Sequence, residues 1–505
     1  MIWATRLPLI VLLVGLGAIA MLVPALHAYV TRDLVTARAF LYSCIMFLFL
    51  FTMIAVATSN YKIRRQGRSH LISLFALFAV LPAMLAVPFS EVVTDTTFAN
   101  AYVEMVSSLT TTGLTMFDAD RLPPSLHLWR ALVGWLGGFF MWVAAIAIFA
   151  PLKLGGFEVV AATESGREDK SGVVRLDHVG EPSERLTRFA ARLAPIYMSL
   201  TGVLWVMLMV AGDAPLVAIC HAMATLSTSG ISPLEAGVAD ATSGFGGEVL
   251  ILIFLVFALS RLTFTSDGRQ DGWPALVRDP ELRLGIGLIA IIPTLLFLRH
   301  WLATIDEGAE VTLLEGIVGL WGAVFTVASF LTTTGFESAA WGDARAWSGL
   351  DATGLVLMGL AVFGGGVATT AGGVKLLRVY ALVKHGQREM DKLVSPSSVG
   401  GSGHVARRFR REGAYVAWVF FMLFALSIAL LSTLLAYFGL SFEDALILTI
   451  ASLSTTGPLV DVASDVPIDL IGLAPAAKAT LTAAMVLGRL ETLAIIALLN
   501  PEFWR

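Results

Sequence analysis

Long apolar runs alternate with short polar segments along almost the whole chain. A helix of about 20 mainly apolar residues is long enough to cross a hydrocarbon core of about 30 Å. The pattern therefore predicts ten membrane-spanning helices. The predicted spans cover residues 7–30, 39–59, 69–89, 128–151, 190–211, 247–264, 284–303, 351–383, 414–438 and 470–499.

The first of these runs has two interpretations. It follows Arg6 and contains the small residues of Ala25–Ala28, which loosely resemble the cleavage site of a secretory signal. However, the run is longer than the apolar part of a signal, which has about 7–15 residues, and a second span follows closely. We therefore predict an uncleaved membrane helix.

Four shorter apolar stretches lie between the spans. They are too short to cross the membrane, so we predict re-entrant half-helices, which enter and leave on the same side. Each of them ends in a Thr/Ser-Gly segment. The half-helices are expected near residues 98–110, 214–227, 316–332 and 442–454.

The Thr/Ser-Gly segments align with one another. They read SLTTTGLT (108–115), TLSTSGIS (225–232), FLTTTGFE (330–337) and SLSTTGPL (452–459), and we call them the glycine segments. Their glycines are 117, 105 and 122 residues apart, which indicates an internal repeat of span, half-helix, glycine segment and span. The predicted units are an N-terminal helix pair (1–66) and four repeats (67–155, 156–270, 271–400 and 401–505).

The composition agrees with a polytopic all-α membrane protein. Of the 505 residues, 57% are hydrophobic and 14% are charged, whereas soluble domains have about 25% charged residues. The short alternating segments of a transmembrane barrel are missing from the sequence. The two cysteines provide neither a disulfide framework nor metal-ligand spacing, and the eight histidines include no HExxH motif.

Lysine and arginine are distributed very unevenly among the loops. Residues 60–70, 152–192, 261–283 and 375–412 contain 24 of the 34, but the stretches around the glycine segments contain only Arg121 and Arg345. The positive-inside rule places the basic loops and both termini in the cytoplasm and the glycine segments near the outer face. The basic cluster Arg407–Arg411 either serves topology alone or also docks a cytoplasmic partner.

The outer segments are acidic, and two interpretations remain for their carboxylates. Together they form a negative vestibule that raises the local cation concentration, or each is simply part of a solvated rim. The acidic residues are Asp118, Asp120, Glu235, Glu337, Asp343, Glu443, Asp444 and Asp461.

The glycine segments have the chemistry of a selectivity filter. A dehydrated cation needs oxygen ligands, and extended backbone supplies rings of carbonyls when glycine permits the required dihedral angles. No carboxylate precedes the glycine in any copy, so we predict potassium, bound at the glycine carbonyls. The predicted ion-binding residues are Thr111, Thr112, Gly113, Thr228, Ser229, Gly230, Thr333, Thr334, Gly335, Thr455, Thr456 and Gly457.

Together with Gly364–Lys375, Gly488–Glu491 and the ending Asn500–Arg505, these segments resemble the TrkH/TrkG/KtrB superfamily of potassium transporters over essentially the whole chain. The two extra N-terminal spans favour the TrkH type. The resemblance implies four membrane–pore-loop–membrane units around a pseudo-fourfold pore. It also implies a homodimer with a TrkA-like cytoplasmic nucleotide-binding regulator. The second segment departs from many relatives, which have a longer or double-glycine version.

The run Gly364–Gly373 contains five glycines in ten residues and interrupts one long apolar stretch. It is either a packing kink or a mobile loop below the filter, and the resemblance favours a gate. Arg489, a charge within an apolar span, is expected to face the protein interior or water. The predicted gate residues are Gly364, Gly365, Gly366, Thr369, Thr370, Gly372, Gly373, Lys375 and Arg489.

The sequence thus predicts potassium uptake across a bacterial inner membrane, with no bound cofactor, no nucleic-acid partner and no enzymatic activity. A sodium-coupled potassium symporter is the alternative. A membrane-embedded enzyme would need paired intramembrane carboxylates or a metal motif, and neither is present in the sequence. A structural or receptor subunit would leave the four aligned glycine segments unexplained.

Overall fold

The computed structural model describes residues 8–58, 66–150, 156–157, 182–260, 276–307, 313–348, 353–394, 411–464 and 466–491. Within these ranges every regular element is a helix. Seven helices there are long and apolar enough to cross a membrane. The predicted all-α polytopic membrane fold is therefore confirmed.

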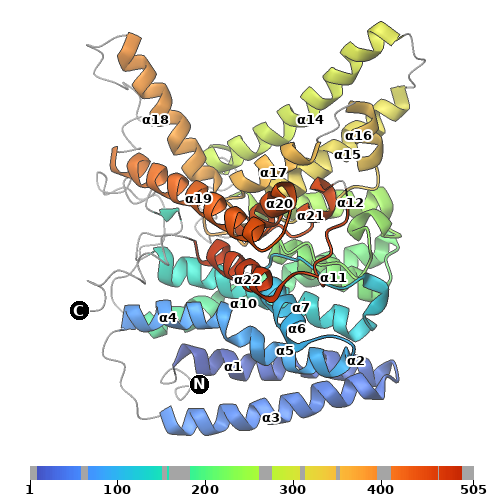
Figure 1. Ribbon diagram of the computed structural model, residues 1–505, viewed down its shortest axis with the longest axis vertical. Coiled ribbons are helices and arrows are strands. Elements are labelled where there is room, and N and C mark those ends of the chain that lie inside the picture. Colours follow the sequence, from blue (N-terminus) through green and yellow to red (C-terminus); the bar gives the residue numbers. More distant parts are fainter. Residues whose placement is uncertain are drawn as a thin grey trace.

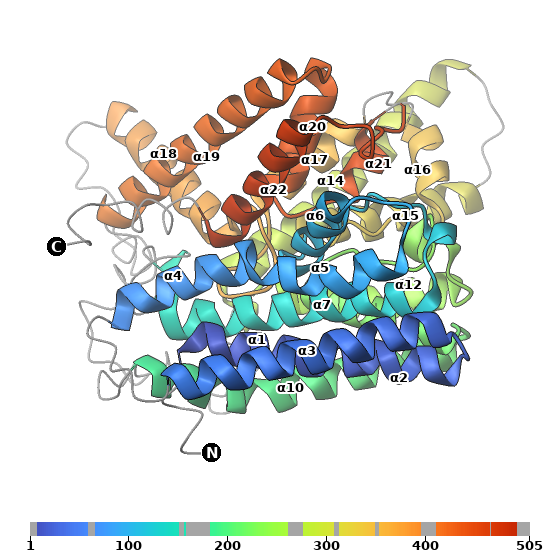
Figure 2. The ribbon, with the colours of Figure 1, turned by 60° about the horizontal axis from the view of Figure 1, so that its bottom comes forward.

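The N-terminal helices form a hairpin that precedes the repeats. It consists of α1 (Leu9–Ala20), α2 (Leu22–Val30) and α3 (Leu34–Thr58). The Asp33 carboxylate accepts the Thr36 backbone N–H at 3.2 Å at the start of α3, as an N-terminal cap does. In Figures 1 and 2 these three helices run side by side at one edge of the molecule, and α2 contacts α7.

Each of the four predicted repeat units contains long helices and one of the predicted half-helices. The first has α4 (Gln66–Ala79), α5 (Leu81–Val92), α6 (Phe98–Leu109) and α7 (Pro124–Ala144); the second has α10 (Pro182–Ala211), α11 (Pro215–Ser227) and α12 (Gly244–Leu255). The third has α14 (Pro280–Glu307), α15 (Leu313–Leu331), α16 (Trp341–Ser348), α17 (Thr353–Phe363) and α18 (Leu376–Val394). The fourth has α19 (Arg411–Tyr437), α20 (Phe442–Leu453), α21 (Leu459–Ala463) and α22 (Pro475–Leu490).

Several predicted spans are shorter or more divided than the apolar runs suggested. The run 351–383 is two helices, α17 and α18, separated by the glycine-rich stretch. The run 247–264 ends its α-helix at Leu255 and adds a short 3₁₀ turn. In the run 470–499 the helix begins at Pro475 and ends at Leu490, before Glu491 with a positive φ of 60°. Residues 492–499 of this run lie outside the described residues. Hydropathy therefore located the apolar segments but not the turns within them.

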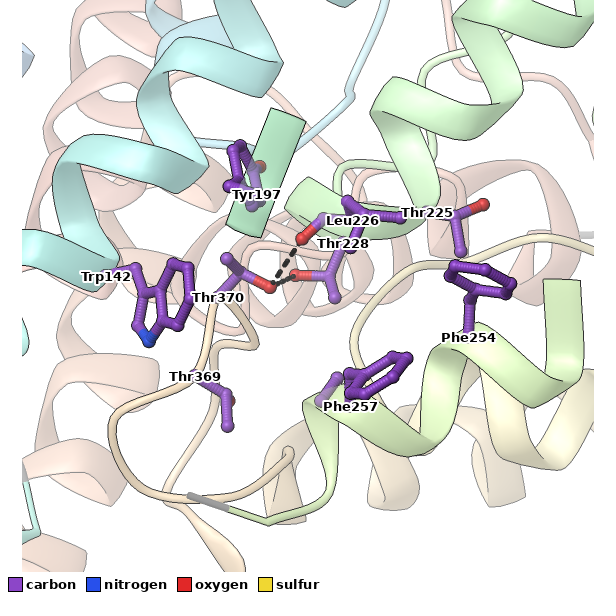
Figure 3. A pocket seen from close by; sticks show the side chains of 10 residues that line it. Trp142, Tyr197, Thr225, Leu226, Thr228, Phe254, Phe257, Thr369 and Thr370 are labelled. Atoms are coloured by element: carbon purple, nitrogen blue, oxygen red, sulfur yellow. Dashed lines mark hydrogen bonds between the residues drawn. The ribbon is translucent and has the colours of Figure 1, made fainter. Parts of the chain in front are cut away.

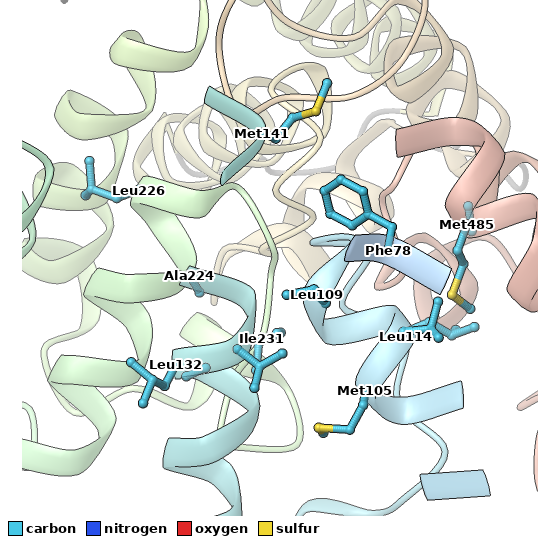
Figure 4. Packing of buried hydrophobic residues seen from close by; sticks show 14 of the residues in the cluster. Phe78, Met105, Leu109, Leu114, Leu132, Met141, Ala224, Leu226, Ile231 and Met485 are labelled. Atoms are coloured by element: carbon cyan, nitrogen blue, oxygen red, sulfur yellow. The ribbon is translucent and has the colours of Figure 1, made fainter. Parts of the chain in front are cut away.

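The centre of the molecule is built from α7 and the half-helices. In α7 and its continuation to Phe149, 78% of the span window is buried, against 28% for the spans in α10, α14 and α19. Figure 4 shows apolar side chains of α6, α7, α11 and α22 packed between these elements, among them Met105, Leu132 and Met485. The exposed apolar surfaces of the outer spans suit contact with lipid.

Candidate functional site

The four glycine segments meet although they are far apart in the chain. A methyl group built on each glycine would touch the next segment. The nearest atoms are the Ser229 carbonyl oxygen at 1.9 Å for Gly113, the Thr334 carbonyl oxygen at 2.1 Å for Gly230, Pro458 Cδ at 3.0 Å for Gly335, and the Leu114 nitrogen at 2.1 Å for Gly457. These contacts close on themselves, so the segments form a ring of four.

The same turn precedes the glycine in every segment. The threonine two positions before the glycine is left-handed, with φ of 55° at Thr111, 51° at Thr228, 57° at Thr333 and 54° at Thr455. This conformation costs a non-glycine residue about 1–2 kcal/mol. Four independent occurrences at one aligned position indicate a shared backbone design that the surrounding packing maintains.

A hydroxyl three positions before the glycine stabilises this turn, and the sequence analysis missed it. It contacts the hydroxyl of the residue directly before the glycine, at 2.8 Å for Thr110–Thr112, 3.0 Å for Ser227–Ser229, 3.1 Å for Thr332–Thr334 and 3.2 Å for Ser454–Thr456. The signal was present in the sequence, since the alignment has Ser or Thr there in all four copies.

The half-helices position the glycine segments in the ring. Thr97 and Ser441 cap the N-termini of α6 and α20 by accepting backbone N–H groups at 3.4 and 3.0 Å, and Pro215 occupies the first position of α11. Each half-helix ends within a few residues of its glycine, so the partial negative charge of its C-terminus lies beside the ring. This arrangement favours a cation at the centre.

The fourth segment differs from the other three. Gly457 is not left-handed, whereas Gly113, Gly230 and Gly335 have φ of 74°, 64° and 86°. Pro458 follows it and disfavours helical or turned backbone at the preceding residue. The Gly457 N–H donates to the Thr112 carbonyl at 2.5 Å. The second segment, which departs from many relatives in sequence, has the same turn as the first and third.

The glycine-rich loop, residues 364–375, lies against the threonine side of this ring. The Thr370 hydroxyl is 3.3 Å from the Thr228 hydroxyl and donates to the Leu226 carbonyl at 3.2 Å. The Gly372 N–H donates to the Thr333 hydroxyl at 2.7 Å. A methyl group on Gly372 would meet the Ser454 carbonyl oxygen, so the loop reaches the second, third and fourth segments.

Hydrogen bonds from backbone N–H groups hold the first half and the end of this loop. The N–H groups of Val374 and Lys375 donate to carbonyls at the end of α17, each at 2.9 Å, and the Val367 N–H donates to the Glu281 carboxylate at 2.9 Å. Gly364 and Gly373 have φ of 70° and 75°, which glycine adopts at no steric cost. The part of the loop that contacts the ring is the stretch with Thr370 and Gly372.

A small cavity lies beside the contact between the loop and the second segment. Figure 3 shows Thr228 and Thr370 on one side of it, Trp142 and Tyr197 on another, and Phe254 and Phe257 opposite. The dashed lines mark the contacts from Thr370 to Thr228 and Leu226. The lining combines four aromatic side chains with four threonines, so polar and apolar groups alternate around the space beside the loop.

The predicted basic gate residues are both buried next to the loop. The Arg489 Nη1 donates to the Thr370 carbonyl at 2.7 Å, and the Lys375 ammonium donates to the Ala371 carbonyl. Arg489 is 3% exposed and Lys375 is 5% exposed. Two long cationic side chains, one from α22 and one from the last residue of the loop, are therefore attached to carbonyls of the loop.

An ion pair that the sequence analysis did not predict connects α18 to the end of α22. The Arg378 guanidinium is 2.7 Å from the Glu491 carboxylate and lies 3.7 Å over the Phe420 ring. Glu491 is only two residues from Arg489, and the helix ends between them, so the two side chains point to different partners. A contact across 113 residues leaves no pattern in a single sequence.

Two predicted acidic residues lie near the ring on the side away from the loop. Glu337 follows Gly335 by two residues, and Asp461 lies in α21 just after the fourth segment. Burial and, to a smaller extent, the charge of Asp461 raise the pKa of Glu337 to about 7, and the charge of Arg345 opposes the rise. The basic cluster Arg407–Arg410 and the ending Asn500–Arg505 lie outside the described residues.

Comparisons with known proteins agree with this geometry. The TrkH family model, described as a cation transport protein, matches residues 284–503. The Trk system potassium uptake protein TrkH of Halomonas elongata is 30% identical over 435 residues, 86% of this chain and 84% of the relative. TrkH of Escherichia coli is 29% identical over 98% of both chains. The crystal structure of the potassium transporter TrkH from Vibrio parahaemolyticus has a TM-score of 0.81 and 25% identity, with both chains fully covered.

Proposed function

The chain belongs to the TrkH family of potassium transporters, and from this premise we propose that it conducts potassium into the cell through the ring of glycine segments. The observation that carries the proposal is the turn that recurs in all four glycine segments. One backbone design, with a left-handed threonine two residues before each glycine, recurs four times around a closed ring. Membership in a transporter family also means that the chain is not an enzyme.

In this proposal the segments form the selectivity filter. Carbonyls of the residues at and before each glycine replace the hydration shell of a dehydrated potassium ion. The half-helix C-termini add negative potential at the ring. The ion is the transported substrate, held by backbone oxygens of Gly113, Gly230, Gly335 and Gly457 and their preceding residues.

The glycine-rich loop is proposed to be the gate. Its contacts with Thr228 and Thr333 support this role, because a loop held on the inner side of the ring would block an ion that leaves the filter. Arg489 and Lys375 hold the loop carbonyls in this position and add positive charge that opposes a resident cation. Opening then requires the loop to exchange these contacts for others.

The cellular setting follows from the sequence and the family. We propose a multi-pass protein of the bacterial inner membrane with both termini in the cytoplasm. The basic loops contain many more Lys and Arg residues than the stretches around the glycine segments, and such loops stay on the cytoplasmic side. The family resemblance supports a homodimer and a TrkA-like nucleotide-binding regulator on the cytoplasmic side, acting on the loop through α18 and α22.

Growth of a bacterium without its own potassium uptake systems tests this function. Expression of the chain is expected to restore growth at low potassium, and Gly335→Ser is expected to weaken growth most in medium with high sodium. Restored growth that depends on added sodium would favour the symporter. No rescue, with the protein present in the membrane together with its regulator, would contradict the proposal.

A further inference from the structure

The residue nine positions before each filter glycine occupies a special place in the half-helix. In the first three copies it is polar and contacts the stretch that leaves the filter. The Glu104 carboxylate accepts the Met116 N–H at 2.8 Å, the His221 Nε2 is 2.9 Å from the Ser232 hydroxyl, and the Thr326 hydroxyl accepts the Ser338 N–H at 3.3 Å. The fourth copy has Leu448, which is fully buried.

The first of these contacts is backed by a second charge. The other oxygen of the Glu104 carboxylate is 2.6 Å from Arg130 Nε, and the two side chains are 0% and 4% exposed. Arg130 comes from α7, the most buried span. This ion pair fixes both side chains, because removing either partner would leave the other charge buried and unpaired.

We propose that this position is a positioning residue of the filter, and that Glu104 with Arg130 is its strongest form. The inference rests on the proposed filter function. It links the half-helix before the glycine to the chain after it, so the glycine is held from both ends. The position thereby sets how closely the filter carbonyls approach a potassium ion.

Each glycine segment forms one wall of the proposed filter, and its backbone needs contacts with the rest of the protein on the side away from the ion. Carbonyls that turn toward an ion leave the chain with fewer backbone hydrogen bonds than a strand ladder provides, although the Thr112 carbonyl also accepts the Gly457 N–H. A donor or acceptor on the rigid half-helix substitutes for this ladder. A binding site must be held to about 0.5 Å to keep its specificity.

The four walls are supported to different degrees. Glu104 is charged, while His221 and Thr326 make single bonds to side-chain or backbone groups. The third wall has additional support, because the Glu248 carboxylate accepts the Ala339 N–H at 2.7 Å. The fourth wall has Leu448 and relies instead on the fixed φ of Pro458. The strongest effect of a substitution is therefore expected at Glu104.

Reversal potentials under potassium–sodium gradients, with the full chain in planar bilayers, test this inference. Glu104→Gln removes the charge and the ion pair, and we expect the potassium-to-sodium permeability ratio to fall on the order of tenfold. Ser232→Ala deletes a hydroxyl that contacts His221 and accepts the Leu234 N–H, and Thr326→Val deletes one hydroxyl contact. Neither change strands a charge, and we expect reductions of about two- to threefold. The ratio does not depend on how much protein is active.

The matched control is Asp213→Asn. Asp213 is also a buried carboxylate, 5% exposed, that accepts a backbone N–H, from Ser243 at 2.8 Å, but this contact lies outside the glycine segments. We expect it to leave the permeability ratio unchanged. An equal fall in Asp213→Asn would overturn the inference, because a general structural effect would explain it.

The remaining outcomes separate the inference from the proposed function. A wild-type protein without potassium preference contradicts the filter itself. A selective wild type whose ratio survives in Glu104→Gln, or in Ser232→Ala and Thr326→Val if the first variant does not fold, overturns only the positioning role. Reduced ratios in all three variants support it.

Discussion

Replacing Gly113 with alanine perturbs the ring at its closest contact. The added methyl group would lie 1.9 Å from the Ser229 carbonyl oxygen, and Cβ atoms essentially never approach other atoms within 3.0 Å. The carbonyl would therefore have to move by at least about 1.1 Å. This exceeds the tolerance of about 0.5 Å for a specific binding site, and the affected oxygen is one of the proposed ligands. We expect the potassium-to-sodium permeability ratio to fall at least about tenfold, which corresponds to about 1.4 kcal/mol.

The chain offers a matched control for the backbone part of this effect. Gly244 also has a left-handed φ, 51°, but a methyl group there would meet nothing within 4 Å. Both alanine variants carry a conformational cost of about 1–2 kcal/mol, but only Gly113→Ala displaces a filter carbonyl. Gly244→Ala is therefore expected to lower thermal stability and keep the ion preference.

The assay is the reversal potential of each purified variant in bilayers with potassium on one side and sodium on the other. Comparable abundance and melting of the two variants establish that both are folded. An unchanged permeability ratio in Gly113→Ala would refute the assignment of the ring as the filter. A ratio lowered equally in Gly244→Ala would show that strain elsewhere is sufficient.

Three further predictions concern the mouth, the loop and the ion pair. Because the pKa of Glu337 is about 7, acidifying the outer side from about pH 8 to about pH 6 neutralises its carboxylate. The single-channel potassium current should then fall, because the negative charge that attracts cations is lost. Glu337→Gln should make the current independent of pH in this range. Gly372→Ala, whose methyl group would meet the Ser454 carbonyl, should raise basal flux in liposomes without the regulator; unchanged flux would count against the gate. Arg378→Ala leaves the buried Glu491 carboxylate without its ion-pair partner, so the free energy of unfolding should fall by about 3–5 kcal/mol. Thermal unfolding measures this change, and a melting temperature equal to that of the wild type would contradict it.

The half-helices were predictable because local signals defined both of their ends. The expected stretches 98–110 and 214–227 became Phe98–Leu109 and Pro215–Ser227. In each case an apolar run of helical length begins at a capping residue or a proline and ends at a Thr/Ser-Gly turn. The repeated glycine at a spacing near 115 residues also predicted that the four segments are equivalent.

Contacts between distant residues were beyond a single sequence. The pair Arg378–Glu491 joins α18 to the end of α22, and no periodicity links these positions. The special position of Glu104 could in part have been found from the sequence. Extending the alignment of the four segments to nine residues before the glycine exposes a polar residue in three copies, but only the structure places its partner, Met116, within hydrogen-bonding distance.

Cation flux into proteoliposomes that contain only this chain tests the central claim most directly. Potassium, rubidium and sodium gradients are imposed separately on the wild-type protein. The account predicts potassium and rubidium flux without added sodium, and much smaller sodium flux. Equal flux of sodium and potassium, or potassium flux only when a sodium gradient is present, would contradict a potassium-selective ring of glycine segments.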